Sequence, residues 1–150
     1  MKIAIRPYEP KDLEALTEII TEFSSPTTVE EMRERMQRIE ANPMYATFIA
    51  IYECEAAGMA GVRLHATYTG NRLKTQISTI VTKEAYRRRG VAGALVAHIE
   101  KWAQEQGSDF LYLMSGKGDH RAAARQFYKN HGFDITGYRF VKKLKGDDEI

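Results

Sequence analysis

Residues 87–93, Arg87-Arg88-Arg89-Gly90-Val91-Ala92-Gly93, join two segments of different pattern. The segment before them, residues 72–82, is rich in β-branched residues and predicts a strand. The segment after them, residues 90–106, repeats apolar residues at the helical period and predicts a helix that ends at Gly107. Residues 109–114 then predict a short strand, so this part of the chain is expected to run strand, loop, helix, strand.

The rest of the chain extends this unit in both directions. Pattern and turn residues predict a strand over 2–6, helices over 12–23 and 28–41, strands over 44–53 and 58–69, a helix over 119–130 and a last strand pair over 133–144 around Gly137. Thr28 followed by Glu31 is typical of a helix capping box. The three strands between residues 44 and 82 follow one another through short turns and indicate an antiparallel meander. The fold class is therefore mixed α/β (α+β), and residues 146–150 are expected to fray.

Length and composition indicate one ordinary globular domain over residues 1–150. The 150 residues are 43% hydrophobic and 28% charged, and 22 Lys and Arg against 20 Asp and Glu give a net charge of +2. This near-neutral charge argues against a nucleic-acid partner. No apolar run reaches the roughly 18 residues that a membrane helix needs, so we expect no membrane partner and a cytoplasmic location. The single cysteine, Cys54, and the scattered histidines predict no metal site.

The three consecutive arginines stand where positive charge is unfavourable. A helix N-terminus carries about half a positive charge, so each cation there costs about 0.3–1 kcal/mol. The arrangement fits a bound anion, with Gly90 and Gly93 letting backbone N–H groups approach it closely. No Gly-Lys-Ser/Thr follows, which excludes a Walker A loop. The alternative is a solvated, charged turn ahead of the helix.

Four short motifs stand in order along the chain. They are Ile5-Arg6-Pro7 with Asp12-Leu13, then Arg87-x-x-Gly90-x-Ala92, then Ala124-x-x-Phe127-Tyr128-x-x-x-Gly132-Phe133, and finally Gly137-Tyr138-Arg139-Phe140. Together they resemble the GNAT N-acetyltransferase superfamily. The resemblance implies a GNAT-like fold, a central mixed and mostly antiparallel sheet flanked by about four helices. It also implies direct transfer of an acetyl group from acetyl-CoA, as co-substrate, to a primary amine in a ternary complex.

The resemblance also assigns roles to residues. Cofactor binding is implied for Ile80, Val81, Thr82, Arg87, Arg88, Arg89, Gly90, Val91, Ala92 and Gly93. Tyr128 is implied to assist the departing thiolate; since a tyrosine has a pKa of about 10 and a thiol about 8.5, a hydrogen bond is expected rather than full proton transfer. Simple packing of Tyr128 is the alternative. Ser78 stands where many relatives have a glutamate, and we expect it to hold a water or the acceptor to be an amine of low pKa.

Substrate and assembly are less defined by the sequence. Resemblance implies that the acceptor wall comes from about Thr21 to Met36, where several glutamates would suit a cationic small-molecule or peptide amine. A homodimer through Tyr138 to Leu144 is a further possibility that the resemblance implies. A different function class, an acetyl-CoA-binding sensor without turnover, stays open because no carboxylate lies on the predicted strand over 72–82. A nucleic-acid-binding domain is the third hypothesis.

Overall fold

The computed structural model describes residues 2–115 and 121–145, which form two compact units, Met1–Leu113 and Met114–Ile150. Each unit is described by itself below. The predicted tail at 146–150 and the start of the predicted helix at 119–120 lie outside the described residues. One domain over the whole chain stays a prediction.

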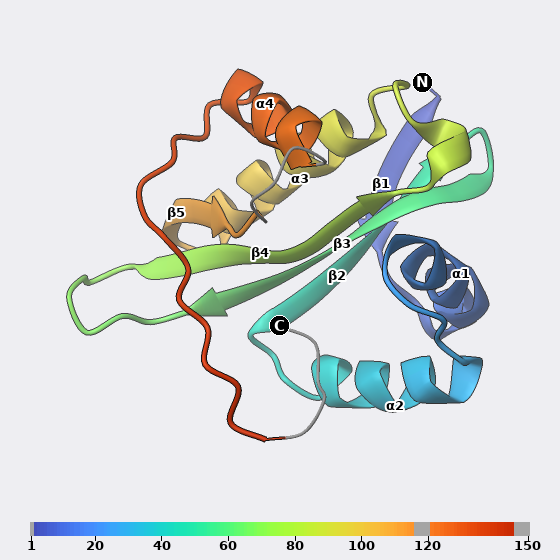
Figure 1. Ribbon diagram of the computed structural model, residues 1–150, viewed down its shortest axis with the longest axis horizontal. Helices are drawn as coiled ribbons and strands as arrows, with labels where there is room; N and C mark the ends of the chain where they lie inside the picture. Colours follow the sequence, from blue (N-terminus) through green and yellow to red (C-terminus); the bar gives the residue numbers. More distant parts are fainter. Residues whose placement is uncertain (1, 116–120, 146–150) are drawn as a thin grey trace. The chain divides into compact units, whose positions relative to one another are not determined.

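The first unit contains a five-stranded sheet in the order of the sequence (Figure 1). Its strands are β1 (Ile3–Pro7), β2 (Tyr45–Tyr52), β3 (Glu55–His65), β4 (Leu73–Thr82) and β5 (Ser108–Leu113). Neighbours from β1 to β4 pair antiparallel, whereas β4 and β5 pair parallel. A parallel pair needs a crossover, and α3 (Val91–Glu105) provides it. The predicted mixed, mostly antiparallel sheet is confirmed.

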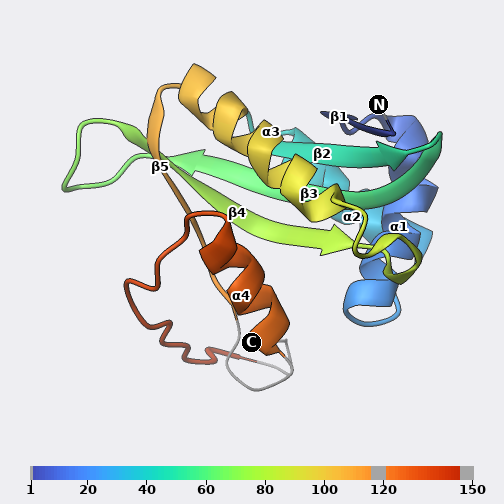
Figure 2. The same cartoon turned by 90° about the horizontal axis from the view of Figure 1, so that it is seen from above.

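Helices cover both faces of this sheet (Figure 2). Along β2, Phe48 packs against the Trp102 ring of α3, and the next residue, Ile49, joins the core under α1 (Leu13–Phe23) and α2 (Val29–Glu40). Successive strand residues point to opposite faces, so α3 lies on one face and α1 and α2 on the other. Leu16 and Ile19 of α1 are fully buried in that core.

Side-chain caps define where the first two helices begin. The Thr28 hydroxyl accepts a 3.1 Å hydrogen bond from the Glu31 amide, and the Glu31 carboxylate accepts a 2.9 Å bond from the Thr28 amide. The predicted capping box is therefore confirmed. Ahead of α1, a 3-10 turn over Pro10–Asp12 is closed by the Asp12 carboxylate, which accepts a 2.8 Å bond from the Glu9 amide.

The second unit contains α4 (Ala122–Asn130); Gly132, two residues past its end, has a φ of +89°. The predicted strand pair over 133–144 is wrong: the described residues there form neither strand nor helix. Ile135, Tyr138 and Phe140 are exposed. β-forming residues stabilise a strand by packing against a paired neighbour, and this segment has no ladder to join among the residues of its own unit that the structure describes.

Candidate active site

The edge of β4 opens halfway along the strand. The ladder between β4 and β5 ends at Ile77 and Leu113, but β4 continues to Thr82. In this second half β4 pairs only with β3, through Thr79–Gly61, Ile80–Ala60 and Thr82–Gly58. Figure 2 shows β5 turning away from β4. Ile80, Val81 and Thr82 therefore lie on an edge of the sheet that is open to another extended chain within the first unit.

The opening coincides with a β-bulge at Ser78. Gly61 of β3 pairs with Thr79 and Val62 pairs with Ile77, which leaves Ser78 as the extra residue of β4. Its side chain is exposed. A bulge bends the strand that carries it, and here the bend falls where β5 leaves.

The loop after β4 leads to the N-terminus of α3, which no side chain caps among the described residues. A 3-10 turn over Glu84–Tyr86 is followed by positive φ angles at Arg88 (63°) and Gly90 (85°), and α3 then begins at Val91. No side chain of the described residues caps this end, and the Ala94 amide bonds to the Gly90 carbonyl at 3.0 Å. The preceding amides, at Val91, Ala92 and Gly93, have no partner within the helix. Such a terminus favours an anion.

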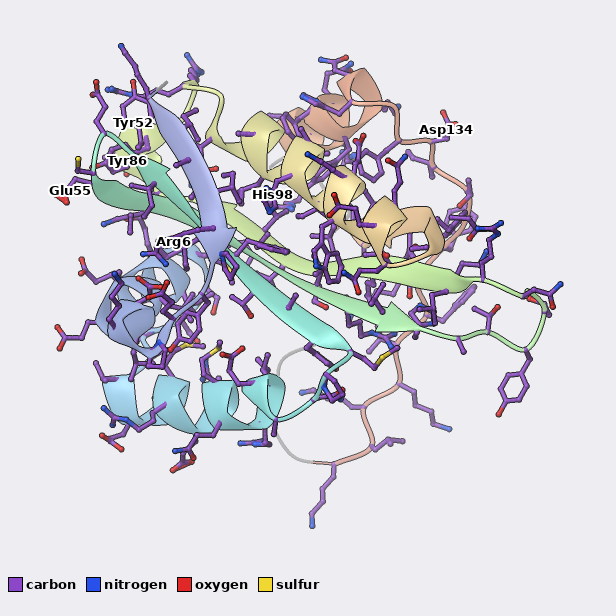
Figure 3. All side chains as sticks on the ribbon, turned by 180° about the vertical axis from the view of Figure 1, so that it is seen from behind. Arg6, Tyr52, Glu55, Tyr86, His98 and Asp134 are labelled. Atoms are coloured by element: carbon purple, nitrogen blue, oxygen red, sulfur yellow. The ribbon has the colours of Figure 1, made fainter. Side chains whose placement is uncertain are left out.

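The three arginines of this loop differ in their surroundings. The Arg89 guanidinium lies 5.5 Å from the centre of the Tyr52 ring, and Tyr52 in turn lies 5.7 Å from the Tyr86 ring (Figure 3). All three arginines are exposed and form no ion pair with any residue that the structure describes, so all three keep their charges available. Arg89 differs in that its contact with Tyr52 also links the loop to β2.

A glycine of β3 lies directly under the junction of β4 and α3. A Cβ added at Gly58 would lie 2.6 Å from the Val81 carbonyl oxygen and 3.2 Å from the Val91 Cγ1. The neighbouring Ala57 carbonyl accepts a 2.8 Å bond from the Lys83 amide. Val81 and Val91 are themselves buried, so only their backbone groups are available to a ligand.

Tyr128 lies on α4 in the second unit. Its ring packs edge-on against Phe127 (5.4 Å between centres) and Phe133 (5.8 Å). Burial raises the pKa of the phenol, and the charge of Arg121 opposes this in part. A raised pKa keeps the hydroxyl protonated at neutral pH, which suits a hydrogen-bond donor. Its action on a thiolate stays a prediction.

A groove of about 460 Å³ lies along α1 in the first unit. It is lined by Glu14, Thr17, Glu18, Thr21, Glu22, Thr27, Val29 and Lys83. The predicted acceptor wall, about Thr21 to Met36, lines the groove only with residues between Thr21 and Val29. Its later glutamates, Glu30, Glu31 and Glu34, do not line it. Glu31 caps α2 and Glu30 pairs with Arg33.

Sequence reasoning missed a polar network on the sheet. The Arg63 Nε donates to Gln76 at 2.7 Å, and His65 bonds to the Tyr112 hydroxyl at 2.8 Å. The register that brings these residues together cannot be read from one sequence. His98 of α3 is half-buried, and its ring lies 4.9 Å from Phe48 of β2 (Figure 3). Which strand residue faces His98 cannot be read from helix periodicity alone.

Two possible extra features find no support in the described parts of the chain. Among residues 2–115 and 121–145, no three histidine, cysteine or acidic side chains gather as metal ligands would. No helix in these ranges is both long and apolar enough to cross a bilayer.

Comparison with solved structures shows the same fold. A GNAT family acetyltransferase from Staphylococcus aureus superposes with a TM-score of 0.83 at 22% identity, covering 96% of this chain and 100% of that one. An aminoglycoside N-acetyltransferase in complex with CoA superposes at 0.80 with 18% identity over 95% of each chain. An aminoglycoside acetyltransferase from an uncultured soil sample, in complex with sisomicin, superposes at 0.80 with 15% identity, covering 96% and 97%.

Comparison of sequences defines the family. A search of curated proteins found no significant match. The model of the acetyltransferase (GNAT) family matches residues 13–133, which include the open half of β4, the arginine loop and α4. The chain therefore belongs to the GNAT acetyltransferase family.

Proposed function

We propose that this protein is an N-acetyltransferase that moves the acetyl group of acetyl-CoA directly to a primary amine in a ternary complex. The observation that carries the proposal is that the second half of β4 has an unpaired edge and is followed, after one loop, by the uncapped N-terminus of α3. Coenzyme A fits these two features: the amides of its extended pantetheine arm can pair with the β4 edge, and its pyrophosphate can bind at the α3 N-terminus. The family membership supports the same reading.

The chain's own residues have distinct tasks in this proposal. The backbone of Ile80, Val81 and Thr82 binds the pantetheine arm as an added strand would. Amides of Val91, Ala92 and Gly93, together with the Arg87 and Arg88 side chains, bind the pyrophosphate. Acetyl-CoA supplies the activated acetyl thioester. Arg89 holds the loop in place through Tyr52.

Binding of coenzyme A tests this part directly. We expect Arg87→Ala and Arg88→Ala each to weaken binding about fivefold to tenfold, since each removes one charge-assisted contact. Calorimetry at two salt concentrations should show a weaker salt dependence in these variants. Arg38→Ala, at an exposed position of α2, is the control. No detectable binding of coenzyme A to the unaltered protein would reject the proposal.

Tyr128→Phe tests the step at the thiolate. In the proposal the phenol donates a hydrogen bond to the departing sulfur, so its loss should lower kcat about tenfold to a hundredfold with little change in KM. The measurement is acetyl transfer from acetyl-CoA to a panel of primary amines, including sisomicin. An unchanged kcat would assign Tyr128 to packing alone.

The groove along α1 supports a cationic acceptor. Its lining carries three carboxylates, those of Glu14, Glu18 and Glu22, and a single ammonium, that of Lys83, so its net charge is negative. Glu22 accepts from the Glu84 amide, and Glu18 lies 3.8 Å from Lys83. We expect Glu14→Gln and Glu18→Gln to raise KM for a cationic amine about threefold to fivefold each, with kcat unchanged. Glu100→Gln, on the exposed side of α3, is the control. Equal KM values in all three variants would remove the groove from the acceptor site.

The second candidate is an acetyl-CoA sensor without turnover. It is favoured by the absence of any carboxylate on β4. Coenzyme A binding without acetylation of any amine would support it over the enzyme. A cytoplasmic location, a homodimer through 138–144 and the lack of a nucleic-acid partner stay predictions.

A further inference from the structure

His65 and Tyr112 form a hydrogen-bonded pair that spans β4. The His65 Nε2 lies 2.8 Å from the Tyr112 hydroxyl, and its Nδ1 lies 3.1 Å from the Ala66 carbonyl oxygen. A carbonyl only accepts, so Nδ1 must carry the proton and donate. Nε2 is then the acceptor, and the Tyr112 hydroxyl donates to it. This leaves the lone pairs of the Tyr112 oxygen free to accept from a substrate.

The pair lies where the sheet opens. Tyr112 is opposite Gln76, one position before the last β4–β5 pair, Ile77 and Leu113. Ser78 follows two positions after Gln76, a step of about 7 Å along a strand. On the same face, next to the pair, the side chains of Arg63 and Gln76 are hydrogen-bonded to each other.

The pair also faces the side of the sheet on which the groove lies. Alternate residues of a strand point to the same face as long as the strand has no bulge. Pairing of β3 with β2 is unbroken from Met59 to Arg63, so His65, two positions after Arg63, lies on the same face as Met59. Met59 packs in the core under Leu16 and Ile19 of α1. The α1 groove lies toward the Lys83 end of β4, seven positions beyond Gln76, so an acceptor held in it has to extend its amine along this face to reach Tyr112.

We propose that Tyr112 and His65 accept the proton that the amine loses during acetyl transfer, in place of the carboxylate that β4 lacks. This inference rests on the N-acetyltransferase function proposed above. The amine nitrogen bonds to the acetyl carbon and the carbon–sulfur bond breaks, with its electron pair leaving on sulfur. The amine proton passes to the Tyr112 oxygen as the Tyr112 proton passes to His65 Nε2. The thiolate is protonated from solvent, to which His65 later returns its proton.

Tyr112 is the catalytic residue in this scheme and His65 acts through it. Three charged groups lie around the pair. Lys74 stands opposite His65 and pairs with Asp109 at 2.8 Å, which holds the pKa of that carboxyl below its usual range, and Arg63 lies two positions before His65. Asp109 therefore stays ionised at neutral pH and neutralises the charge of Lys74 beside the pair.

The test compares Tyr112→Phe and His65→Gln with two controls, Tyr68→Phe in the exposed β3–β4 turn and His131→Gln at the end of α4. With acetyl-CoA and the amine panel, we expect both site variants to lower kcat at least about tenfold with an unchanged KM for acetyl-CoA. A purely structural role would also change the KM for acetyl-CoA, so the fall of kcat at an unchanged KM distinguishes the two.

Two outcomes separate this inference from the proposed function. If the unaltered protein acetylates an amine but both site variants match the controls, the relay is wrong and the acetyltransferase stands. If the unaltered protein acetylates no amine of the panel, both the relay and the proposed acetyltransferase function are wrong. Nitrogen NMR of the full chain adds a readout besides activity: His65 must show a protonated Nδ1 and a bare Nε2 at neutral pH, and the opposite tautomer overturns the relay.

Discussion

Gly58→Ala will weaken coenzyme A binding more than about tenfold, whereas Gly61→Ala will change it less than about twofold. The added methyl at Gly58 meets the Val81 carbonyl oxygen at 2.6 Å and the Val91 side chain at 3.2 Å, so β4 or α3 must shift. At Gly61, in the same strand, nothing lies within 4 Å of an added Cβ. The two variants carry the same change in the same strand and differ only in what the methyl contacts.

Calorimetric binding and thermal unfolding together measure this effect. Overpacking of this kind costs about 1–3 kcal/mol of stability, so the unfolding temperature of Gly58→Ala will also fall. Binding measured well below that temperature separates the two effects. Equal coenzyme A affinities for Gly58→Ala and Gly61→Ala would show that the junction of β4 and α3 does not shape the binding site.

Asp12→Ala will lower the free energy of unfolding by about 1–3 kcal/mol and the unfolding temperature by roughly 3–10 °C. The Asp12 carboxylate accepts from both terminal nitrogens of Arg6, at 2.7 and 2.8 Å, and from the Glu9 amide at 2.8 Å. It is only 7% exposed, so its removal leaves the Glu9 amide without this acceptor and the Arg6 guanidinium with only the Pro7 carbonyl, at 3.1 Å. Lys11→Ala breaks an exposed 3.7 Å pair and should cost less than about 0.5 kcal/mol.

The same residue gives the protein part of its acid sensitivity. The hydrogen bonds from Arg6, more than any other cause, hold the pKa of Asp12 below its usual range. A carboxyl with a lowered pKa in the folded state stabilises that state above the unfolded pKa of about 3.9 and loses this contribution as the pH falls through the folded value. Urea unfolding at pH 7 and pH 3 should therefore show a smaller drop for Asp12→Asn than for the unaltered protein. Equal drops would contradict this assignment.

The sequence predicted the elements that depend on local chemistry. The Thr28 and Glu31 cap, the start of α3 after Gly90 and its end before Gly107 all follow from what single residues allow the backbone to do. The five strands of the first unit were also predicted, but the strand expected over 58–69 begins at Glu55 and ends at His65, because its first half, rich in alanine and glycine, is held by pairing with β2 and not by its own composition.

The sequence could not predict features that depend on partners. The segment at 133–144 has the composition of strands but pairs with no strand in its own unit. The role of Gly58 depends on which residues of β4 and α3 lie above it, and the His65–Tyr112 pair depends on registers across three strands. Arg89 looked like its two neighbours in the sequence, and only the position of Tyr52 distinguishes it.

The extra residue in β4 has a consequence for which side chains the two halves of the strand present to each face of the sheet. Val62 pairs with Ile77 and Gly61 with Thr79, so Ser78 shifts the register between β4 and β3 by one residue and places Ile77 and Thr79 on opposite faces of the sheet. A chain one residue shorter, without Ser78, would form an unbroken ladder and still bury Ile77 and Val81. Ser78 is therefore not needed to bury this strand, and its effect is the bend that it makes where β4 and β5 separate.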